Sequence, residues 1–556
     1  MQGALTPDPD RKVGRSPPLY DAKNDPCFLF SCTGHDASLC SMPQPPNNFS
    51  GYELRRRSSE REEFDLHNNN DDWQHMPTSE SRHSVLRPLW ALINAFIPRR
   101  LKAKGYRQLS PSKLPTGSQL RLRRRRCCSY TFLLLSVLAV LFLLTAIFNP
   151  SYTRPPSHYN ELRQRILDSD DDGPANPSKE NIFIAASLYD SGGQLLNGAW
   201  GKAVLDLIEL LGEKNVYLSI YENEGGSKAR KAMSAFEQKV QSNRSIIWDN
   251  DFIMEDVPHV ELPDGSRRVK RMAFLAQVRN KALEPLEEAA ERTRFDKILY
   301  LNDVIFDPVE ASQLLFSTNH DDNGRASYRT ACAVDFINPF KFYDTFASRD
   351  VAGFSMGVPF FPWFTNSGEG ISRRDVLQGK DAVRVRSCWG GMVAFDAEPF
   401  LGSKPLKFRA TQDLYWDASE CCLVNADLVG DSHPQGESDY GVYMNPYVRV
   451  AYSETTLRWL HTTRRFERLY TIPHTLINRM VGVPWHNPRR EVEGGKMVEE
   501  KVWVPDSNLD TGGSFQMEER RATGDGFCGR RGLQVLKKMK SKKDEKNWEM
   551  IAVPAG

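Results

Sequence analysis

The sequence has almost no net charge, no zinc-type cysteine pattern and none of the common phosphate-binding loops. Among its 556 residues, 73 Lys and Arg balance 71 Asp and Glu to leave a formal charge of +2, so the composition argues against a nucleic-acid binder. The ten cysteines contain no CxxC pair, which argues against a structural zinc site. Neither GxxxxGK(S/T) nor GxGxxG follows a predicted strand, so no Walker loop or dinucleotide-binding loop is expected. The length excludes a small disulfide-stapled module.

Acidic residues are absent between Ser81 and Arg126, a stretch that carries 13 Lys and Arg. Directly after it, the 22 residues Cys127–Phe148 contain no glycine, proline or charge. As a helix this run would be about 33 Å long, against about 30 Å of bilayer hydrocarbon, so it predicts a transmembrane helix in contact with lipid. A buried core helix would show a polar face, and a cleaved signal peptide would lie at the N-terminus. The basic flank places the N-terminal side in the cytoplasm, which predicts a single-pass type II membrane protein.

Residues 1–126 are rich in Pro, Ser, Asn and Asp, which predicts a disordered, basic cytoplasmic tail. Within it, Leu86–Ile97 places apolar residues at helical spacing next to two arginines. This segment is interpreted either as an amphipathic helix on anionic lipid or as a transiently helical piece of the tail. Cys127 and Cys128, at the cytoplasmic end of the apolar run, are candidates for palmitoylation.

The residues beyond the apolar run would lie in an oxidising compartment. Five cysteines fall there, and because five is odd, at least one stays outside the intrachain disulfides. These cysteines are Cys332, Cys388, Cys421, Cys422 and Cys528. Asn243 begins an Asn-Arg-Ser sequon on the same side, which predicts N-glycosylation.

Residues 149–180 contain prolines and an acidic run and predict a lumenal stem. From 181 to about 490, strand and helix periods alternate, with strands predicted at 182–186, 216–221, 245–248, 297–301 and 330–334, and helices at 200–211, 227–240 and 270–290. The alternation predicts an α/β domain with a largely parallel sheet covered on both faces. Residues 491–556 are predicted as a charged C-terminal extension whose lysine-rich end, 537–546, is solvated.

Carboxylates stand at the ends of three predicted strands, as Glu222, Asp303 and Asp335. Ligands of such sheets bind beyond the carboxyl ends of the strands, where a carboxylate can hold a hard divalent cation that bridges a diphosphate. For Asp303 the alternative is a helix cap or a turn. Because the next helix would begin near Pro308, the capping role suits Asp303 less well.

Seven motifs occur in consistent order between about residues 180 and 465: Ser219–Glu222, Arg279–Leu283, Tyr300–Val304, Ala331–Phe336, Phe342–Asp350, Cys388–Met392 and Asn445–Tyr452. Together they resemble fungal glycosyltransferase family 69, which includes the cryptococcal α-1,3-mannosyltransferase and the capsule-associated proteins. The resemblance is highly specific for the family and much less so for the substrate.

The resemblance implies a GT-A-like nucleotide-sugar transferase domain with a mixed, largely parallel sheet. It implies transfer of mannose from GDP-mannose, in α-1,3 linkage, with a divalent cation, Mn²⁺ or alternatively Mg²⁺. Carried onto this sequence, Asn302-Asp303 stands at the DxD-type metal motif with Asn302 in place of the first carboxylate, which leaves Asp303 as the main ligand. His461 or His474 would be the late histidine ligand seen in many GT-A enzymes, and an ordinary surface or core histidine is the alternative.

The resemblance also assigns residues to the donor. Glu222 would contact the nucleoside, while Arg279 and Asn280 would reach the donor phosphate or ribose, with Arg279 supplying charge to the diphosphate. The segment Trp389-Gly390-Gly391 suits a loop that passes close to a sugar, and a tight turn around a buried Trp389 is the alternative.

Sugar transfer also needs a carboxylate near the anomeric carbon or the acceptor hydroxyl. The catalytic candidates are Asp335, Asp344, Arg349, Asp350 and Glu420. For the segment that contains Arg349, the alternative is an internal ion pair with Asp344 or Asp350 that fixes a loop. For Glu420, the alternative is a solvated acid on a helix face.

Three classes of function follow. The first is an anchored Golgi mannosyltransferase that binds a nucleotide sugar and a glycan acceptor in fungal capsule, cell-wall or glycoconjugate synthesis. The second is a noncatalytic polysaccharide-assembly or export factor that keeps the fold, which Asn302 in the metal motif favours. The third is a lumenal carbohydrate-binding module. No nucleic-acid partner is expected, and the sequence is silent on the oligomeric state.

Overall fold

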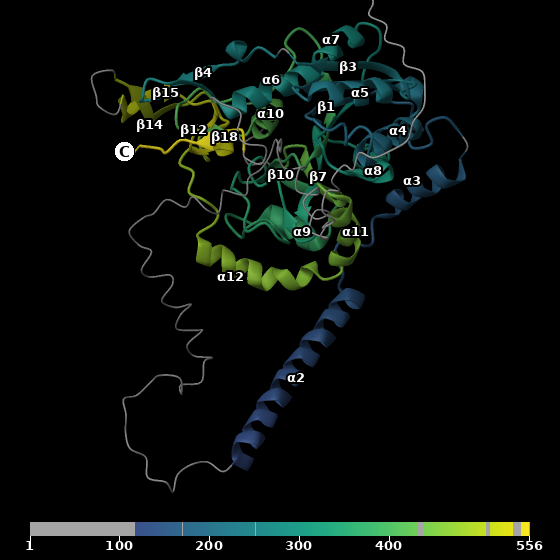
Figure 1. Cartoon of the computed structure of the whole chain (residues 1–556), viewed down its shortest axis with the longest axis vertical. Coiled ribbons are helices and arrows are strands. Elements are labelled where there is room, and N and C mark those ends of the chain that lie inside the picture. Colours follow the sequence, from purple (N-terminus) through teal and green to yellow (C-terminus); the bar gives the residue numbers. More distant parts are fainter. Residues whose placement is uncertain are drawn as a thin grey trace, which may run out of the picture. The chain divides into compact units, whose positions relative to one another are not determined.

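The computed structural model describes residues 117–169, 171–250, 252–430, 438–506, 512–537 and 546–554. Residues 1–116 of the predicted tail, which include Leu86–Ile97, lie outside the described residues. Residues 538–545 of the lysine-rich end also lie outside them. A long sheet with helices on both faces forms the body of the described chain (Figure 1).

The main sheet has ten strands in the order β3-β2-β1-β6-β11-β7-β13-β10-β9, with β8 paired to β7. Strands β3, β2, β1 and β6 run parallel, β11 is antiparallel to both β6 and β7, and β7 is parallel to β13. The strands of this sheet are β1 (Ile182–Leu188), β2 (Val216–Asn223), β3 (Asn243–Asp249), β6 (Lys297–Leu301), β7 (Thr330–Asn338), β8 (Lys341–Phe342), β9 (Arg349–Asp350), β10 (Val383–Ser387), β11 (Met392–Asp396) and β13 (Val442–Ala451). The α/β class and the mixed, largely parallel sheet are confirmed.

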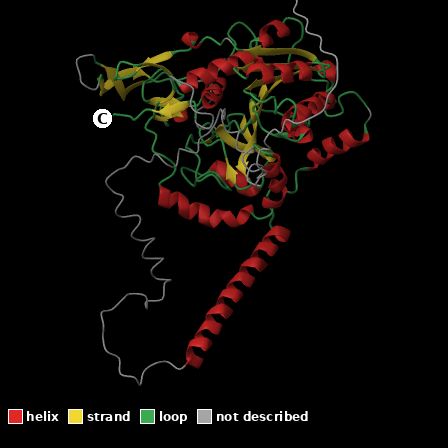
Figure 2. Cartoon of the chain, viewed as in Figure 1, coloured by secondary structure: helices red, strands yellow, loops and turns green. Residues whose placement is uncertain are grey.

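Helices cover both faces of the sheet (Figure 2). Alternate residues of β1 explain why: Ile182 and Ile184 pack with α4, α5 and α8, while Phe183 and Ala185 pack with α6. Since both faces of each central strand are buried, the strands read as continuous apolar runs. The helices of the body are α4 (Ala199–Leu211), α5 (Gly226–Glu237), α6 (Arg271–Leu283), α7 (Pro285–Ala290), α8 (Pro308–Ser317), α9 (Ile371–Gln378), α10 (Glu420–Val429), α11 (Glu454–Thr463) and α12 (Thr471–Val481).

The predicted strands and helices of residues 181–334 are present. The predicted helix 270–290 is divided between α6 and α7, because Pro285 begins a second helix. Asp307 caps α8, and its side chain accepts hydrogen bonds from the N–H groups of Val309 and Glu310. Asp303 is therefore not the cap of this helix.

The segment predicted as the membrane anchor lies within α2 (Gly117–Phe148). Large apolar side chains between Tyr130 and Phe148 are exposed, for example Phe132 at 74% and Leu143 at 61%. Within the part of the chain that the structure describes, no helix is long and apolar enough to span a membrane.

The predicted stem is packed rather than extended. It contains α3 (Ser157–Asp168), which buries Tyr159 and Leu162, and Asn445 donates a hydrogen bond to the Tyr159 hydroxyl at 2.7 Å. The aromatic and aliphatic side chains of α3 find an apolar surface on the body, which the Pro-rich and acidic flanks of this segment did not indicate.

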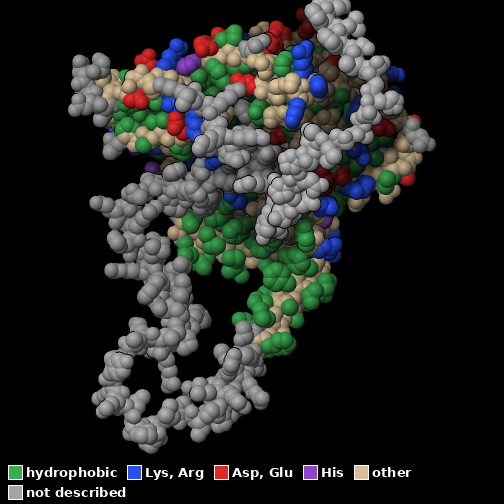
Figure 3. Space-filling view, viewed as in Figure 1, with side chains coloured by type: hydrophobic (Ala, Val, Ile, Leu, Met, Phe, Trp, Pro, Cys, Tyr) green, Lys and Arg blue, Asp and Glu red, His purple; other side chains and the backbone are tan. Residues whose placement is uncertain are grey.

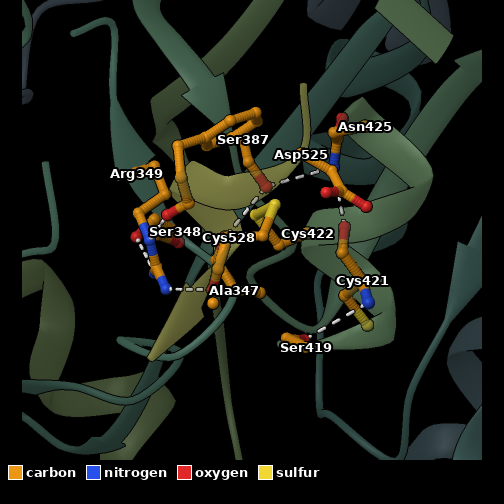
Figure 4. The surroundings of a disulfide bond; sticks show 12 residues. Ala347, Ser348, Arg349, Ser387, Ser419, Cys421, Cys422, Asn425, Asp525 and Cys528 are labelled. Atoms are coloured by element: carbon orange, nitrogen blue, oxygen red, sulfur yellow. Dashed lines mark hydrogen bonds between the residues drawn. A yellow bond between two sulfur atoms is a disulfide. The ribbon is translucent and has the colours of Figure 1, made fainter. Parts of the chain in front are cut away.

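The predicted C-terminal extension is also folded. It contributes β14 (Met497–Pro505), β15 (Gly513–Arg521), β16 (Gly529–Arg531), β17 (Gln534–Leu536) and β18 (Trp548–Met550), and short strands β4 (His259–Glu261), β5 (Arg267–Val269) and β12 (Trp416–Ala418) complete the small sheets. Cys528 forms a disulfide with Cys422 of α10, and β16 pairs with β12. Arg349 donates to the Cys528 carbonyl beside this disulfide (Figure 4).

Candidate active site

The carboxyl ends of three parallel strands meet at one edge of the main sheet. Leu188 of β1 is in register with Glu222 of β2, and Ala186 of β1 is in register with Leu301 of β6. Because β11 is antiparallel to β6, Met392 at its start pairs with Leu301. The fold therefore brings the loop after β6 and the loop before β11 to the same place, as parallel α/β sheets do at their ligand-binding edge.

Asn302 directly follows β6, and its side chain is 1% exposed. Its Oδ1 accepts hydrogen bonds from Nη1 of Arg279 and Nε1 of Trp389, each at 3.2 Å. Its carbonyl accepts a third hydrogen bond, from Nε1 of Trp200, at 2.8 Å. With both lone pairs of Oδ1 engaged, Asn302 positions its neighbours and is a poor metal ligand in this arrangement.

Arg279 and Glu420, predicted separately as a donor ligand and a catalytic acid, form a buried ion pair. Nε of Arg279 lies 3.0 Å from Oε1 of Glu420, and their side chains are 1% and 2% exposed. The guanidinium also lies 4.4 Å from the ring centre of Trp389, a cation–π contact. Both residues are enclosed and stabilise the floor of the site, and Nη2 of Arg279 has no hydrogen-bond partner in the structure.

Trp389 is fully buried, so the alternative of a tight turn around a buried ring describes this loop better than a sugar platform. Gly390 and Gly391 both have positive φ, of +61° and +69°. A Cβ at Gly390 would lie 1.9 Å from the carbonyl oxygen of Ala333, which no side chain tolerates. A disulfide between Cys388 and Cys332 of β7 fixes the start of the loop.

Asp335 and Asp344 form a buried carboxyl pair beside this loop. Oδ1 of Asp335 accepts from the backbone N–H of Asp344 at 3.1 Å, and Oδ2 accepts from the Tyr452 hydroxyl at 3.2 Å. Oδ2 of Asp344 accepts from the N–H of Gly390 at 3.2 Å. Burial raises the pKa of Asp344 to about 6, and burial together with the Asp344 charge raises the pKa of Asp335 well above its ordinary value. Such a pair can hold and release a proton near neutral pH.

Glu222 is the penultimate residue of β2 and has no exposed surface. Its Oε1 accepts from the N–H of Asp190 at 3.3 Å, whereas Oε2 has no hydrogen-bond partner in the structure. Burial raises the pKa of Glu222 to about 7. An unsatisfied buried carboxyl oxygen at a ligand-binding edge fits a polar ligand such as a ribose or base, because a bound donor group would remove the cost of leaving it unpaired.

Asp190 was not among the predicted site residues. Its carboxylate accepts from the N–H groups of Gln194, Leu195 and Leu196 at 2.7, 2.9 and 3.1 Å. It thereby orders the loop after β1 against Glu222. The signal available in the sequence was its position directly after the first predicted strand.

Three further predicted residues support the surrounding structure. Asn280 binds the backbone of Phe408, through Nδ2 to the carbonyl and Oδ1 to the N–H, at 2.9 and 2.8 Å. Arg349 donates to backbone carbonyls, including that of Phe527 at 2.9 Å. Asp350 accepts from the N–H of Phe354 at 2.8 Å, and burial raises its pKa to about 7.

The two histidines predicted as alternative late metal ligands lie on α11 and α12. His461 is exposed on α11, and His474 is buried in α12, where Nδ1 lies 2.8 Å from Nη1 of Arg373. Burial and then the Arg373 charge lower the pKa of His474 to about 4. Asn243, the predicted glycosylation site, is exposed at the start of β3.

The described residues contain no group of three or more His, Cys, Asp or Glu side chains arranged for a metal. Asp303 is half-buried directly beyond β6. A single carboxylate fits Mn²⁺ or Mg²⁺ only where substrate phosphates supply further oxygens, which is the usual way such cations are held at nucleotide sites. The donor set therefore fits a cation that arrives with the nucleotide sugar.

The solved structures to which the chain is weakly similar include the following two. The mannosyltransferase PcManGT from Pyrobaculum calidifontis, in complex with GDP-Man and Mn²⁺, is 10% identical with a TM-score of 0.27, and the match covers 62% of this chain and 79% of that one. Mannosyl-3-phosphoglycerate synthase from Rubrobacter xylanophilus is 10% identical with a TM-score of 0.24, and the match covers 67% and 91%. No curated protein matches the sequence.

A comparison of the sequence with protein-family models identifies one matching family. The model described as cryptococcal mannosyltransferase 1 matches residues 181–427. That range contains β1 to β12 and six of the seven motifs on which the resemblance was based. Residues 181–427 belong to the cryptococcal mannosyltransferase family, as the sequence predicted.

Proposed function

We propose that the chain is a glycosyltransferase that transfers mannose from GDP-mannose to a glycan acceptor with the help of a divalent cation. The observation that carries the proposal is the sheet edge that gathers Asp303, the unsatisfied Glu222 and the carboxyl pair Asp335–Asp344. Family membership of residues 181–427 supports a mannosyl-transferring enzyme. The GT-A-like architecture is part of the proposal, supported by the parallel strands β3-β2-β1-β6 followed by the antiparallel β11.

In this proposal Asp303 and Glu222 bind the donor, and Asp344 transfers a proton. Asp303 would hold the cation, which neutralises the departing diphosphate when bound. Glu222 would accept a hydrogen bond from the nucleoside through its unsatisfied oxygen. Asp344, with a pKa of about 6, is suited to take a proton from the acceptor hydroxyl, while Asp335 and Gly390 hold it in place.

The cellular setting belongs to the same proposal. The apolar run of α2 would anchor the chain in the Golgi membrane, with the folded body in the lumen and residues 1–126 in the cytoplasm. The disulfides Cys332–Cys388 and Cys422–Cys528 support an oxidising compartment. The α-1,3 linkage and an acceptor in capsule or cell-wall synthesis are carried over from the family resemblance.

Asp303→Asn tests the central step. With purified full-length chain, GDP-mannose and Mn²⁺, we expect GDP release to fall about 100-fold, equivalent to about 2.7 kcal/mol of lost transition-state stabilisation. Asp322→Asn, which makes the same change at an exposed position, is the control and should keep wild-type turnover. Equal turnover of both variants would contradict the role of Asp303.

A noncatalytic assembly factor is the second candidate, because Asn302 replaces a metal carboxylate and is turned inward toward Arg279 and Trp389. Calorimetry separates the two functions. The enzyme should bind GDP-mannose more tightly in the presence of Mn²⁺, whereas a degenerate site should bind neither ligand.

A further inference from the structure

Helix α12 buries its polar side. His474 is fully buried and Asn478 is 6% exposed. Nδ2 of Asn478 lies 3.1 Å from Nδ1 of His474, and Oδ1 of Asn478 accepts from the N–H of Val358 at 2.8 Å. Arg373 contacts His474 from α9. The inward face of α12 is therefore held by hydrogen bonds, and the helix contributes little apolar surface to the core.

The opposite side of α12 is apolar and exposed. Ile472, Leu476 and Met480 are 82%, 60% and 39% exposed. Their spacing of four residues places them in one stripe along the helix. A helix between a protein core and water shows the reverse arrangement, with the apolar stripe inward. The orientation of α12 thus indicates that its exposed stripe contacts an apolar surface outside the folded body.

Aromatic and basic side chains surround this stripe. Trp459 of α11 and Phe340 are 56% and 53% exposed, and the Phe340 ring lies 6.4 Å from that of Tyr470 at the start of α12. Between residues 458 and 482 the sequence has five arginines and one acidic residue, Glu467, which is paired with Arg449. Aromatic rings beside apolar residues and arginines are the composition of surfaces that lie at a lipid headgroup layer.

The apolar run of α2 joins the body in this same region. The rings of Phe142 and Phe466 are 5.6 Å apart, and the N–H of Ser151 donates to the carbonyl of Arg464 at 3.0 Å. Phe466 and Arg464 lie in the short connection between α11 and α12. Figure 3 shows hydrophobic side chains on α2 and on the side of the body that carries α12.

We propose that this α12 surface, made of Ile472, Leu476, Met480, Trp459 and Phe340, rests in the headgroup and outer acyl region of the lipid bilayer. The exposed arginines Arg458, Arg465 and Arg479 contact headgroup phosphates. The inference relies on the proposed anchor only for bringing the membrane close. Lipid contact at a second place would fix the orientation of the body above the membrane, and with it the direction that the carboxyl edge of the parallel strands faces.

Photocrosslinking tests the α12 surface in the full-length chain, reconstituted in lipid nanodiscs of phosphatidylcholine. Benzoylphenylalanine is placed singly at Ile472, at Leu138 of α2 and at Met517. Met517 is 54% exposed on β15 and is the matched control for an exposed apolar side chain. Lipid adducts are measured by mass spectrometry of the digested protein.

We expect the label at 472 to form lipid adducts at least tenfold above the label at 517. Lipid adducts at 138 with none at 472 would overturn the α12 surface and leave the anchor intact. Adducts at 472 without adducts at 138 would support the surface and refute the anchor. Crosslinks from 472 to a second copy of the chain would overturn lipid contact and assign the surface to self-association.

Discussion

The buried ion pair between Arg279 and Glu420 gives the sharpest stability prediction. We consider Arg279→Met, which keeps much of the side-chain volume but removes the charge. Glu420, 2% exposed in the wild type, would then be an unpaired carboxylate in the protein interior. Removing one partner of a buried pair costs about 3–5 kcal/mol, because the remaining charge loses its compensation.

The predicted size of the effect follows from the length of the folded body. For a body of residues 151–556, an unfolding entropy of about 2.1 cal/mol/K per residue makes each kcal/mol worth about 1.2 °C in the melting temperature. Arg279→Met should therefore lower the melting temperature by roughly 4–6 °C. Adding Glu420→Gln should recover at least half of this loss, because the second change removes the stranded charge.

Differential scanning calorimetry of the full-length chain in detergent measures these shifts. Arg292→Met is the matched control: Arg292 also pairs with a glutamate, Glu288, but their side chains are 78% and 77% exposed. A surface pair of this kind contributes about 0.3–0.5 kcal/mol, so the control should shift by less than about 1 °C. Equal shifts for Arg279→Met and Arg292→Met would refute the reasoning from burial. A double variant less stable than Arg279→Met alone would refute the charge argument.

Two further predictions concern pH and the C-terminal residues. Burial raises the pKa of Glu222 from 4.5 to about 7. Between these two pH values the folded chain keeps a proton that the unfolded chain loses. The free energy of unfolding therefore falls as the pH rises through this range. The melting temperature of Glu222→Gln should be higher than that of the wild type at pH 8 and equal to it at pH 4. For Glu255→Gln, at an exposed position, the difference from the wild type should not change with pH. A difference between Glu222→Gln and the wild type that is the same at both pH values would contradict the raised pKa of Glu222. Replacing Cys422 and Cys528 by Ser opens a disulfide spanning 106 residues, and the melting temperature should fall by about 6 °C; a fall below 1 °C would show that the C-terminal strands dock without it.

Among the predicted site residues, Asp303 lies directly beyond β6, while Glu222 and Asp335 lie in the carboxyl-terminal halves of β2 and β7. Asp303, Glu222 and Asp335 could be placed at one sheet edge because apolar runs of parallel strands are recognisable and their carboxyl ends share an edge. Arg349, predicted from its charged segment, and Asn280, assigned from the family resemblance, behaved differently. Arg349 and Asn280 bind backbone groups, and a polar residue that ties two segments together has the same appearance in the sequence as one that binds a ligand.

The sequence by itself determined the alternating strands and helices and the family. It also determined that at least one of the five cysteines beyond the apolar run stays outside the intrachain disulfides, and that Asp303 does not cap the helix that follows it. These features depend on residue periodicity and on motifs a few residues long, which are local. The tertiary structure alone decided that Arg279 meets Glu420, 141 residues away, that Cys332 pairs with Cys388 while the Cys421 thiol donates to Glu420, and that α12 presents its apolar stripe outward. Each of these depends on which distant segments pack together, because burial and charge compensation are set by the surroundings of a side chain rather than by its neighbours in the chain.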